Sequence, residues 1–197
     1  MHFSALYYGK KFVDDHLGNF LNKPCRILDV GAHDINGTLQ PFFTGEGKEL
    51  WKFIGVDMDA GKGVDVVVKP HVPLPFEDGS FDAIVSTSCM EHDPMFWVTF
   101  EDIARLVSPD GFIYLNVPSN GFYHAFPGDC WRLKHDAWYG LQCWIEQVNP
   151  KINLRCVEHF VGDMLGGELW RDNVSIWKRN PSVWCTDCAC TPVDRNP

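Results

Sequence analysis

The chain has 197 residues, of which 45% are hydrophobic, and this supports one α/β domain with its own core but not two full domains. A formal charge of -9 and a pI near 5.2 oppose broad attraction to phosphate backbones or anionic lipid, so we expect no nucleic-acid partner. The first residues do not resemble a secretion signal, and no apolar run approaches the ~20 residues that span a bilayer. We therefore expect a cytoplasmic protein without a membrane span, and the sequence leaves its oligomeric state open.

The eight cysteines are expected to be reduced thiols, because no export signal precedes them. Cys185, Cys188 and Cys190 have the spacing of metal ligands, but no second Cys or His pair lies near them in sequence to complete a set of four. We interpret residues 181–197 as a cysteine-containing tail and assign no metal ligands. Whether these three thiols bind a metal stays open.

The first predicted element is a helix within residues 1–23, for which Ser4 is a suitable N-cap. We interpret residues 1–23 as a helical flank or lid over one end of the domain, ended by Pro24. Residues 25–30 are apolar apart from Arg26 and Asp29, which is typical of a strand covered on both faces.

Two further strands are predicted over residues 51–57 and 64–68, both of them buried. Parallel strands usually need a crossover of about a dozen residues, and only residues 58–63 lie between these two. Six extended residues reach ~20 Å, whereas a five-residue strand is ~16 Å long. We therefore predict an extended crossover here and a sheet that lacks one flanking helix.

Strands and helices alternate along the remaining chain, as in a doubly wound α/β sheet. Strands are predicted over 81–88, 112–117, 154–160 and 173–178, and helices over 93–107 and 136–147. Asp93 and Pro94 supply an N-cap and a first-turn proline for the first of these helices, and Glu101 and Arg105 are expected to pair on its exposed side. The pattern breaks into a polar, aromatic loop over residues 118–134.

The strand over residues 25–30 runs into Gly31, a geometry common to many nucleotide-binding folds. Glycines at 31 and 37 do not form the three-glycine dinucleotide fingerprint, and no Gly-Lys-Ser/Thr phosphate loop occurs in the chain. Pyrophosphate cofactors are therefore disfavoured. Taken alone, this turn fits an ordinary strand-to-helix connection equally well.

Four motifs in a fixed order narrow this interpretation. They are Ile27-Leu-Asp-Val-Gly31, Leu74-Pro-Phe-Glu-Asp-Gly-Ser-Phe-Asp82, Glu91-His92 and Arg105-Leu-Val-Ser-Pro-Asp-Gly111. With them the chain, over about residues 24–120, resembles class I S-adenosylmethionine (SAM)-dependent methyltransferases, specifically a small single-domain group. His124 to Arg132 resembles a segment of methyltransferases that accompany glycan-assembly enzymes.

The resemblance implies a Rossmann-like, mostly parallel seven-stranded sheet with an antiparallel last strand, as one domain over residues 24–180. It also implies SAM as the cofactor and S-adenosylhomocysteine as the product. Asp57, at the end of a strand, is placed to accept hydrogen bonds from the two ribose hydroxyls, and Asp29 is placed to bind the cofactor's ammonium group directly or through water. His33 replaces a glycine usual in the family.

Twelve residues are predicted to bind the cofactor. They are Asp29, Gly31, Ala32, His33, Gly37, Asp57, Met58, His71, Val72, Ser86, Thr87 and Ser88. Two alternatives stay open: His71 fits a solvent-facing loop residue nearly as well as an adenine contact, and some of the serine and threonine hydroxyls fit backbone caps.

Methyl transfer is an in-line displacement that requires alignment, exclusion of water and, for a hydroxyl acceptor, removal of a proton. His92, His124 and Asp129 are the predicted catalytic residues, with the two histidines as candidate bases because imidazole titrates near ~6.5. His92 fits a structural link between strand and helix at least as well.

Tyr123, Trp131 and Arg132 are predicted to bind the acceptor, because aromatic and polar groups together suit a sugar or another polyol. An ion pair between Asp129 and Arg132, with Trp131 buried, explains the same residues equally well. The sequence thus predicts methyl transfer to an oxygen, less readily a nitrogen, of a small-molecule or glycan-linked acceptor. The alternatives are a SAM-binding partner protein without catalysis and, less favoured, a nicotinamide-dependent reductase.

Overall fold

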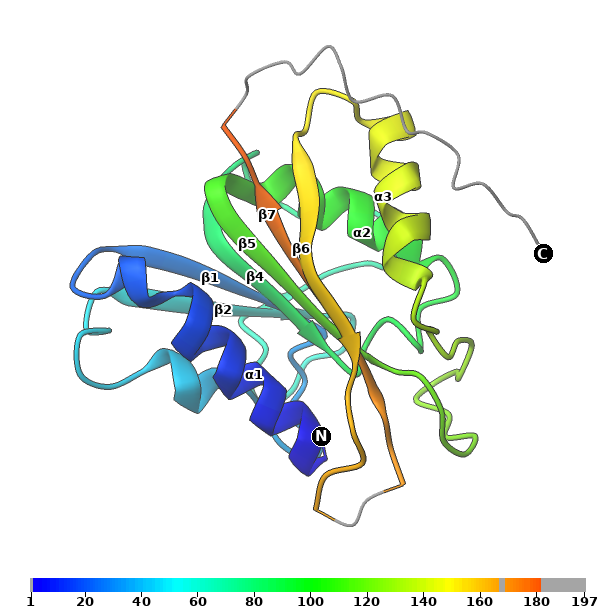
Figure 1. Ribbon diagram of the computed structural model, residues 1–197. Helices are drawn as coiled ribbons and strands as arrows, with labels where there is room; N and C mark the ends of the chain where they lie inside the picture. Colours follow the sequence, from blue (N-terminus) through cyan, green and yellow to red (C-terminus); the bar gives the residue numbers. More distant parts are fainter. Residues whose placement is uncertain (1, 167–168, 182–197) are drawn as a thin grey trace.

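A computed structural model describes residues 2–166 and 169–181, and its centre is a seven-stranded sheet with the order β3-β2-β1-β4-β5-β7-β6 (Figure 1). The strands are β1 (Cys25–Val30), β2 (Trp51–Asp57), β3 (Val66–Val67), β4 (Phe81–Thr87), β5 (Val107–Pro118), β6 (Leu154–Val161) and β7 (Asp172–Arg179). The α-helices are α1 (Phe3–His16), α2 (Phe96–Leu106) and α3 (Ala137–Val148), and the short 3₁₀ helices are η1 (Gly18–Phe20) and η2 (Gln40–Phe43). The cysteine tail predicted over residues 181–197 lies outside the described residues from position 182 onward.

The strand directions are those of a doubly wound sheet with one reversed strand. β1 pairs in parallel with β2 and β4, β2 with β3, and β4 with β5. β7 lies between β5 and β6 and runs antiparallel to both. The predicted mostly parallel, Rossmann-like sheet with an antiparallel last strand is therefore confirmed.

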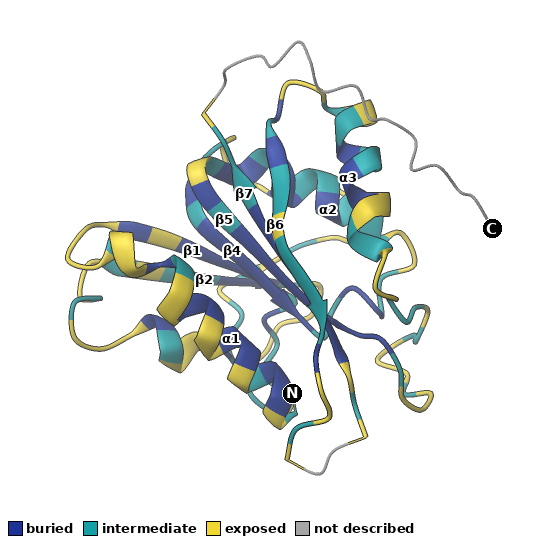
Figure 2. Cartoon of the chain, in the orientation of Figure 1, coloured by how far each residue is buried: buried dark blue, intermediate teal, exposed yellow. Residues whose placement is uncertain are grey.

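Helices cover both faces of the sheet and bury two apolar cores, seen as the dark strands in Figure 2. On one face α2 and α3 pack on the sheet through residues such as Phe100 and Ile145, and on the other α1 packs through Phe12, whose ring stacks on Tyr114 at 5.0 Å. The predicted N-terminal helix is thus a layer of the domain. Its cap was predicted wrongly: the helix begins at Phe3, so Ser4 lies buried inside the first turn and caps nothing. No helix among the described residues is long and apolar enough to cross a membrane.

The helix-free crossover between β2 and β3 is confirmed, since β3 pairs in parallel with β2 and no helix separates them. Gly55 N donates to Asp65 Oδ2 at 2.8 Å, and Asp65 N donates to Gly55 O at 2.8 Å. Asp65 thus contacts β2 with its side chain as well as its backbone. The regular ladder between β2 and β3 begins only after it and comprises Val66–Val67, of which Val67 is exposed. The prediction of a buried strand over residues 64–68 was therefore too long. The connection from β1 to β2 also lacks an α-helix and contains only η2.

The helix predicted to begin at Asp93 and Pro94 begins at Phe96. Asp93 still accepts a hydrogen bond from Met95 N at 2.8 Å, but it does so in the turn that precedes α2. Residue Asp93 therefore organises the entry to the helix without being its N-cap.

The expected ion pair between Glu101 and Arg105 is replaced by pairs with Asp102 and Asp78. Arg105 also donates to the carbonyl oxygens of Leu74 and Phe76. Its guanidinium group thus binds the segment before β4 to α2, which explains why it turns away from Glu101. These contacts tie two of the four sequence motifs together.

Candidate active site

Two aspartates lie at the carboxyl ends of adjacent parallel strands, Asp29 near the end of β1 and Asp57 at the end of β2. Asp29 is buried, and its pKa is raised to about 7, first by desolvation and second by the negative charge of Asp57. Asp57 Oδ2 accepts a hydrogen bond from His33 N at 3.1 Å, and Oδ1 accepts one from Asp59 N at 3.1 Å. Each oxygen keeps a lone pair for a further donor.

The turn after β1 requires a glycine. Gly31 has a φ of +83°, and a Cβ atom there would lie 2.5 Å from the Cβ and Sγ atoms of Cys89. The backbone N–H groups of Gly31 and Ala32 both donate to Val56 O, at 3.0 and 3.1 Å. The turn is therefore held by the end of β2, and the Cys89 side chain occupies the space that a side chain at Gly31 would need. Gly37 also has a positive φ, and its N–H donates to Asp34 Oδ1 at 2.8 Å.

His33 lies against the crossover that follows β2. A Cβ atom on Gly61 would be only 2.0 Å from His33 Nε2, so the imidazole rests directly on the Gly61 backbone. Its Nδ1 atom is buried and has no hydrogen-bond partner among the described residues. A side chain at position 33 is thus accommodated because a glycine faces it from another segment.

The hydroxyl groups at the end of β4 differ in what they contact. Ser86 Oγ donates to Val30 O at 2.8 Å, which is the backbone-cap alternative for this residue. Thr87 Oγ1 is buried without a partner among the described residues, and Ser88 has a left-handed φ of +51°. The Thr87 hydroxyl is therefore unpaired within the described chain.

The loop after β3 places His71 against the turn before α2. His71 Nε2 lies 2.6 Å from Asp93 Oδ1, and its side chain is only 19% exposed, so it does not face solvent freely. Val72 and Met58, predicted beside it in the cofactor site, are both exposed.

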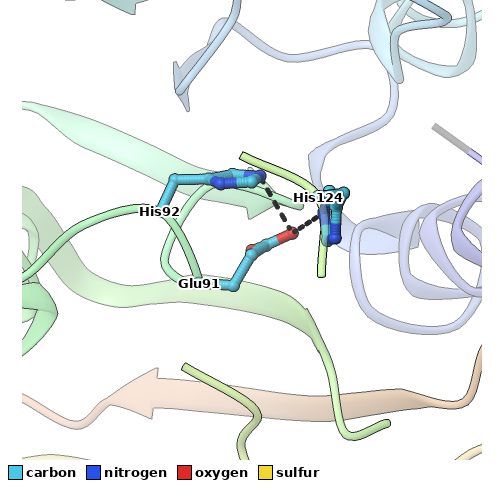
Figure 3. A group of neighbouring side chains, drawn as sticks. All are labelled: Glu91, His92 and His124. Atoms are coloured by element: carbon cyan, nitrogen blue, oxygen red, sulfur yellow. Dashed lines mark ion pairs between the residues drawn. The ribbon is translucent and has the colours of Figure 1, made fainter. Parts of the chain in front are cut away.

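A buried carboxyl group and two imidazoles converge beyond the end of β4 (Figure 3). Glu91 Oε1 lies 3.7 Å from His92 Nε2 and 4.0 Å from His124 Nε2, and the two rings meet edge to face at 4.9 Å. Glu91 is fully buried, and neither of its carboxyl oxygens has a hydrogen-bond partner in the described chain. Burial raises its pKa to about 8.

Both imidazoles are held through their other nitrogen. His92 Nδ1 donates to Gly128 O at 2.5 Å. His124 Nδ1 lies 3.2 Å from Phe122 O and 3.6 Å from Asp129 Oδ2. Gly128 O therefore favours the His92 tautomer with a proton on Nδ1 and a lone pair on Nε2. His124 Nδ1 has neighbours of both kinds, because Arg132 Nη2, which can only donate, also lies 3.2 Å from it.

Asp129 and Arg132 form the ion pair that was one of the two sequence interpretations. Arg132 donates from Nη1 to Oδ1 and from Nη2 to Oδ2, and the Asp129 side chain is 3% exposed. The guanidinium group holds the pKa of Asp129 well below its usual range. Asp129 Oδ2 also accepts a hydrogen bond from His124 N at 2.8 Å, so the pair fixes the backbone that carries this imidazole.

The aromatic residues predicted to bind the acceptor lie in different surroundings. Trp131 is partly buried, its Nε1 donates to Asp93 O at 2.9 Å, and its ring packs edge to face on Phe96. Tyr123 is 78% exposed. Two residues of this site were not predicted from the sequence. Trp170 has its ring 5.0 Å from that of His124, and Glu91 was predicted only as part of a motif.

Comparisons with known proteins indicate a methyltransferase domain and fold. The profile of a family described as "Methyltransferase domain" matches residues 46–115, whereas no curated protein sequence matches the chain. Among solved structures, the 1,6-didemethyltoxoflavin-N1-methyltransferase of Burkholderia thailandensis, with bound 1,6-didemethyltoxoflavin and S-adenosylhomocysteine, is similar at a TM-score of 0.65 and 16% identity, over 90% of this chain and 79% of that one. The YcgJ protein of Bacillus subtilis is similar at a TM-score of 0.58 and 13% identity, over 92% of this chain and 100% of that one. The [4+2]-cyclase SpnF shares the fold as well, at a TM-score of 0.62 and 12% identity, over 90% of this chain and 81% of that one.

The profile match over residues 46–115 and the fold support a SAM-dependent methyltransferase, the class that the four motifs predict. The cofactor of this class is SAM, which confirms the cofactor prediction. The site residues fit it, because a buried carboxyl, a strand-end carboxylate and a glycine turn meet at one edge of the sheet.

Proposed function

We propose that this methyltransferase moves the methyl group of SAM to an oxygen, less readily a nitrogen, of a small-molecule or glycan-linked acceptor. The observation that carries the proposal is the pair of imidazoles at Glu91, whose Nε2 atoms both face its carboxyl group. A hydroxyl acceptor must lose a proton as the methyl group is transferred, and a neutral imidazole accepts a proton near neutral pH.

The cofactor supplies a methyl group on a positively charged sulfur. Asp57 binds the ribose hydroxyls through the lone pairs that His33 N and Asp59 N leave free. Asp29 binds the ammonium group, a cation that favours the charged form of this buried carboxyl. Gly31, Ala32, His33 and Gly37 form the wall next to the methionine half.

The remaining proposed cofactor contacts come from three short segments. They are Met58 after β2, His71 and Val72 in the loop after β3, and Ser86, Thr87 and Ser88 at the end of β4. Thr87 contributes a free hydroxyl, whereas Ser86 shapes the site through its bond to Val30 O.

His124 is the proposed base, because its side chain is 39% exposed and an acceptor can reach it, whereas that of His92 is 14% exposed. Asp129 acts through His124 by holding its backbone N–H, and Arg132 holds Asp129. Tyr123, Trp131 and Trp170 supply aromatic surface on the acceptor side. The acidic chain and the absence of a spanning helix among the described residues support a small-molecule acceptor and a cytoplasmic location.

The test is product analysis by mass spectrometry. The purified protein is incubated with SAM and matched pairs of acceptors, each a polyol or phenol and its amine counterpart, and then with host extract. O-methylated products and S-adenosylhomocysteine are expected. Methylated amines without any O-methylated product would overturn the choice of atom. SAM binding without turnover on any acceptor or extract would favour a non-catalytic partner protein.

A further inference from the structure

We propose that Glu91, His92 and His124 form a binding site for one divalent transition-metal ion of the zinc type. One ligand atom from each residue lies within 4.8 Å of the other two, in the group that Figure 3 draws. Neither the sequence motifs nor the family profile assigns a metal to this chain.

The buried carboxyl group is the first argument. Both oxygens of Glu91 are buried and lack a partner in the described residues, although buried polar groups are nearly always paired. Glu91 is held in place by its own backbone, since its carbonyl oxygen accepts hydrogen bonds from Cys130 N at 2.7 Å and Trp131 N at 3.1 Å. These bonds fix the backbone of Glu91, and its side chain faces two imidazoles with which it makes no hydrogen bond. A cation between the three groups would satisfy the carboxyl group.

The orientation of the imidazoles is the second argument. A histidine that binds a metal usually donates its other ring N–H to a carbonyl or carboxylate oxygen. His92 Nδ1 does this to Gly128 O, and His124 Nδ1 faces Phe122 O and Asp129 Oδ2. The Nε2 atom of His92 is therefore left as a lone-pair donor beside Glu91 Oε1. The Nε2 atom of His124 faces the same oxygen, and its Nδ1 lies between these two acceptors and the donor Arg132 Nη2, 3.2 Å away.

The distances suit a metal-free form of such a site. Ligands bound at ~2.1 Å in a tetrahedron are about 3.4 Å apart, and Glu91 Oε1 lies 3.7 and 4.0 Å from the two Nε2 atoms. Small side-chain rotations close this gap. His124 is the ligand on the open side of the cluster, so solvent or an acceptor oxygen can occupy the remaining coordination positions.

The set of two imidazoles and one carboxylate selects the kind of ion. Mg²⁺ and Ca²⁺ prefer oxygen ligands, whereas imidazole suits Zn²⁺ and its transition-metal neighbours. Two histidines, one glutamate and an open position are the ligands of several catalytic zinc sites. With the ion bound, the imidazoles are ligands, and they act as proton acceptors only in the metal-free protein.

The test uses the metal alone, without SAM or an acceptor, so its outcome is independent of the proposed methyl transfer. The full-length chain carries Cys185→Ser, Cys188→Ser and Cys190→Ser, so that thiols outside the described residues cannot bind the ion. After treatment with a chelator, Zn²⁺ binding is measured by calorimetry, and Co²⁺ binding by visible absorption. One equivalent of each is expected.

Glu91→Gln and His124→Gln should each weaken Zn²⁺ binding by at least about 100-fold, the upper end of what loss of a supporting contact alone costs. The matched control is His135→Gln, an exposed histidine outside the cluster, which should leave affinity unchanged. Circular dichroism checks folding. If Glu91→Gln fails to fold, the Zn²⁺ affinity of His124→Gln, a change at a partly exposed position, decides the test. Less than one equivalent of Zn²⁺, or unchanged affinity in both site variants, would overturn the proposal.

Discussion

The buried carboxyl group of Asp29 lies close enough to Asp57 for the negative charge of Asp57 to raise its pKa. The two residues belong to adjacent parallel strands, β1 and β2. Desolvation is the larger cause, and the pKa of Asp29 reaches about 7. In the cofactor-free protein, folding thus favours the protonated form of this carboxyl group. A bound ammonium group favours the opposite form, so stability and cofactor binding make opposite demands on Asp29.

Asp29→Asn is therefore expected to stabilise the cofactor-free protein at high pH. Because the folded pKa of Asp29 is above its unfolded value, wild-type stability falls as the pH rises from the unfolded pKa, ~3.9, toward about 7. The loss is about 1.4 kcal/mol for each unit of pKa difference. Asparagine does not titrate, so the advantage of the variant should be largest near pH 8 and vanish near pH 4.

Urea denaturation of both proteins across this pH range measures the effect. The variant should at the same time bind SAM more weakly in calorimetry, because the ammonium group loses its charged partner. An advantage of the variant that does not change with pH would show that Asp29 does not titrate as described.

Asp57→Ala is expected to weaken SAM binding by at least about 100-fold, since each of its two hydrogen bonds to the ribose contributes about 1.5–3 kcal/mol. The protein should still fold, because within the described chain the side chain accepts hydrogen bonds only from the backbone N–H groups of His33 and Asp59 at the edge of the sheet. Calorimetry with SAM and S-adenosylhomocysteine measures the change. Asp15→Ala, in an exposed pair with Lys11, is the matched control and should bind normally. Equal affinities in all three proteins would contradict the ribose role.

Local sequence patterns predicted the sheet well, because its strands are short apolar runs bounded by turns. Asp57 was located correctly at the end of β2 from the pattern alone. The extended crossover followed from chain length alone, since residues 58–63 cannot hold a helix. By contrast, the 3₁₀ helix η2 between β1 and β2 has no periodicity that a sequence pattern reveals.

The site was harder to predict because its contacts join distant segments. Glu91 belonged to a recognised motif, but the imidazole of His124 that faces its carboxyl group comes from another loop. Trp170 approaches the same imidazole from the segment before β7. His33 departs from the family pattern, and only the structure shows that Gly61 accommodates it. Such pairings leave no local periodic signal.

Two glycine-to-alanine substitutions test how closely the crossover between β2 and β3 packs on β2. Gly55→Ala should be strongly destabilising, because its Cβ atom would lie 1.9 Å from Gly63 O and the backbone itself would have to move. Gly140→Ala is the matched control: no atom lies within 4 Å of its Cβ position in α3, so alanine should stabilise by about 0.5–1 kcal/mol. Urea denaturation of the two variants gives both values. A Gly55→Ala protein as stable as wild type would contradict the close packing of the crossover on β2.

Asp129→Ala should loosen the acceptor-side loop over residues 118–134 while leaving the cofactor site intact. The substitution removes the two carboxylate oxygens that accept hydrogen bonds from Arg132, and one of them, Oδ2, also accepts the hydrogen bond from His124 N. Hydrogen exchange is expected to speed up by at least about tenfold at the His124 amide, since a charge-assisted bond contributes more than 1.4 kcal/mol. SAM affinity should change less than about threefold, because Asp129 lies on a loop that none of the proposed cofactor residues belongs to. Asp136→Ala, whose side chain is 93% exposed beside His135, is the control. Unchanged exchange in Asp129→Ala would show that the ion pair does not position His124, and loss of SAM binding would show that the loop supports the cofactor site directly.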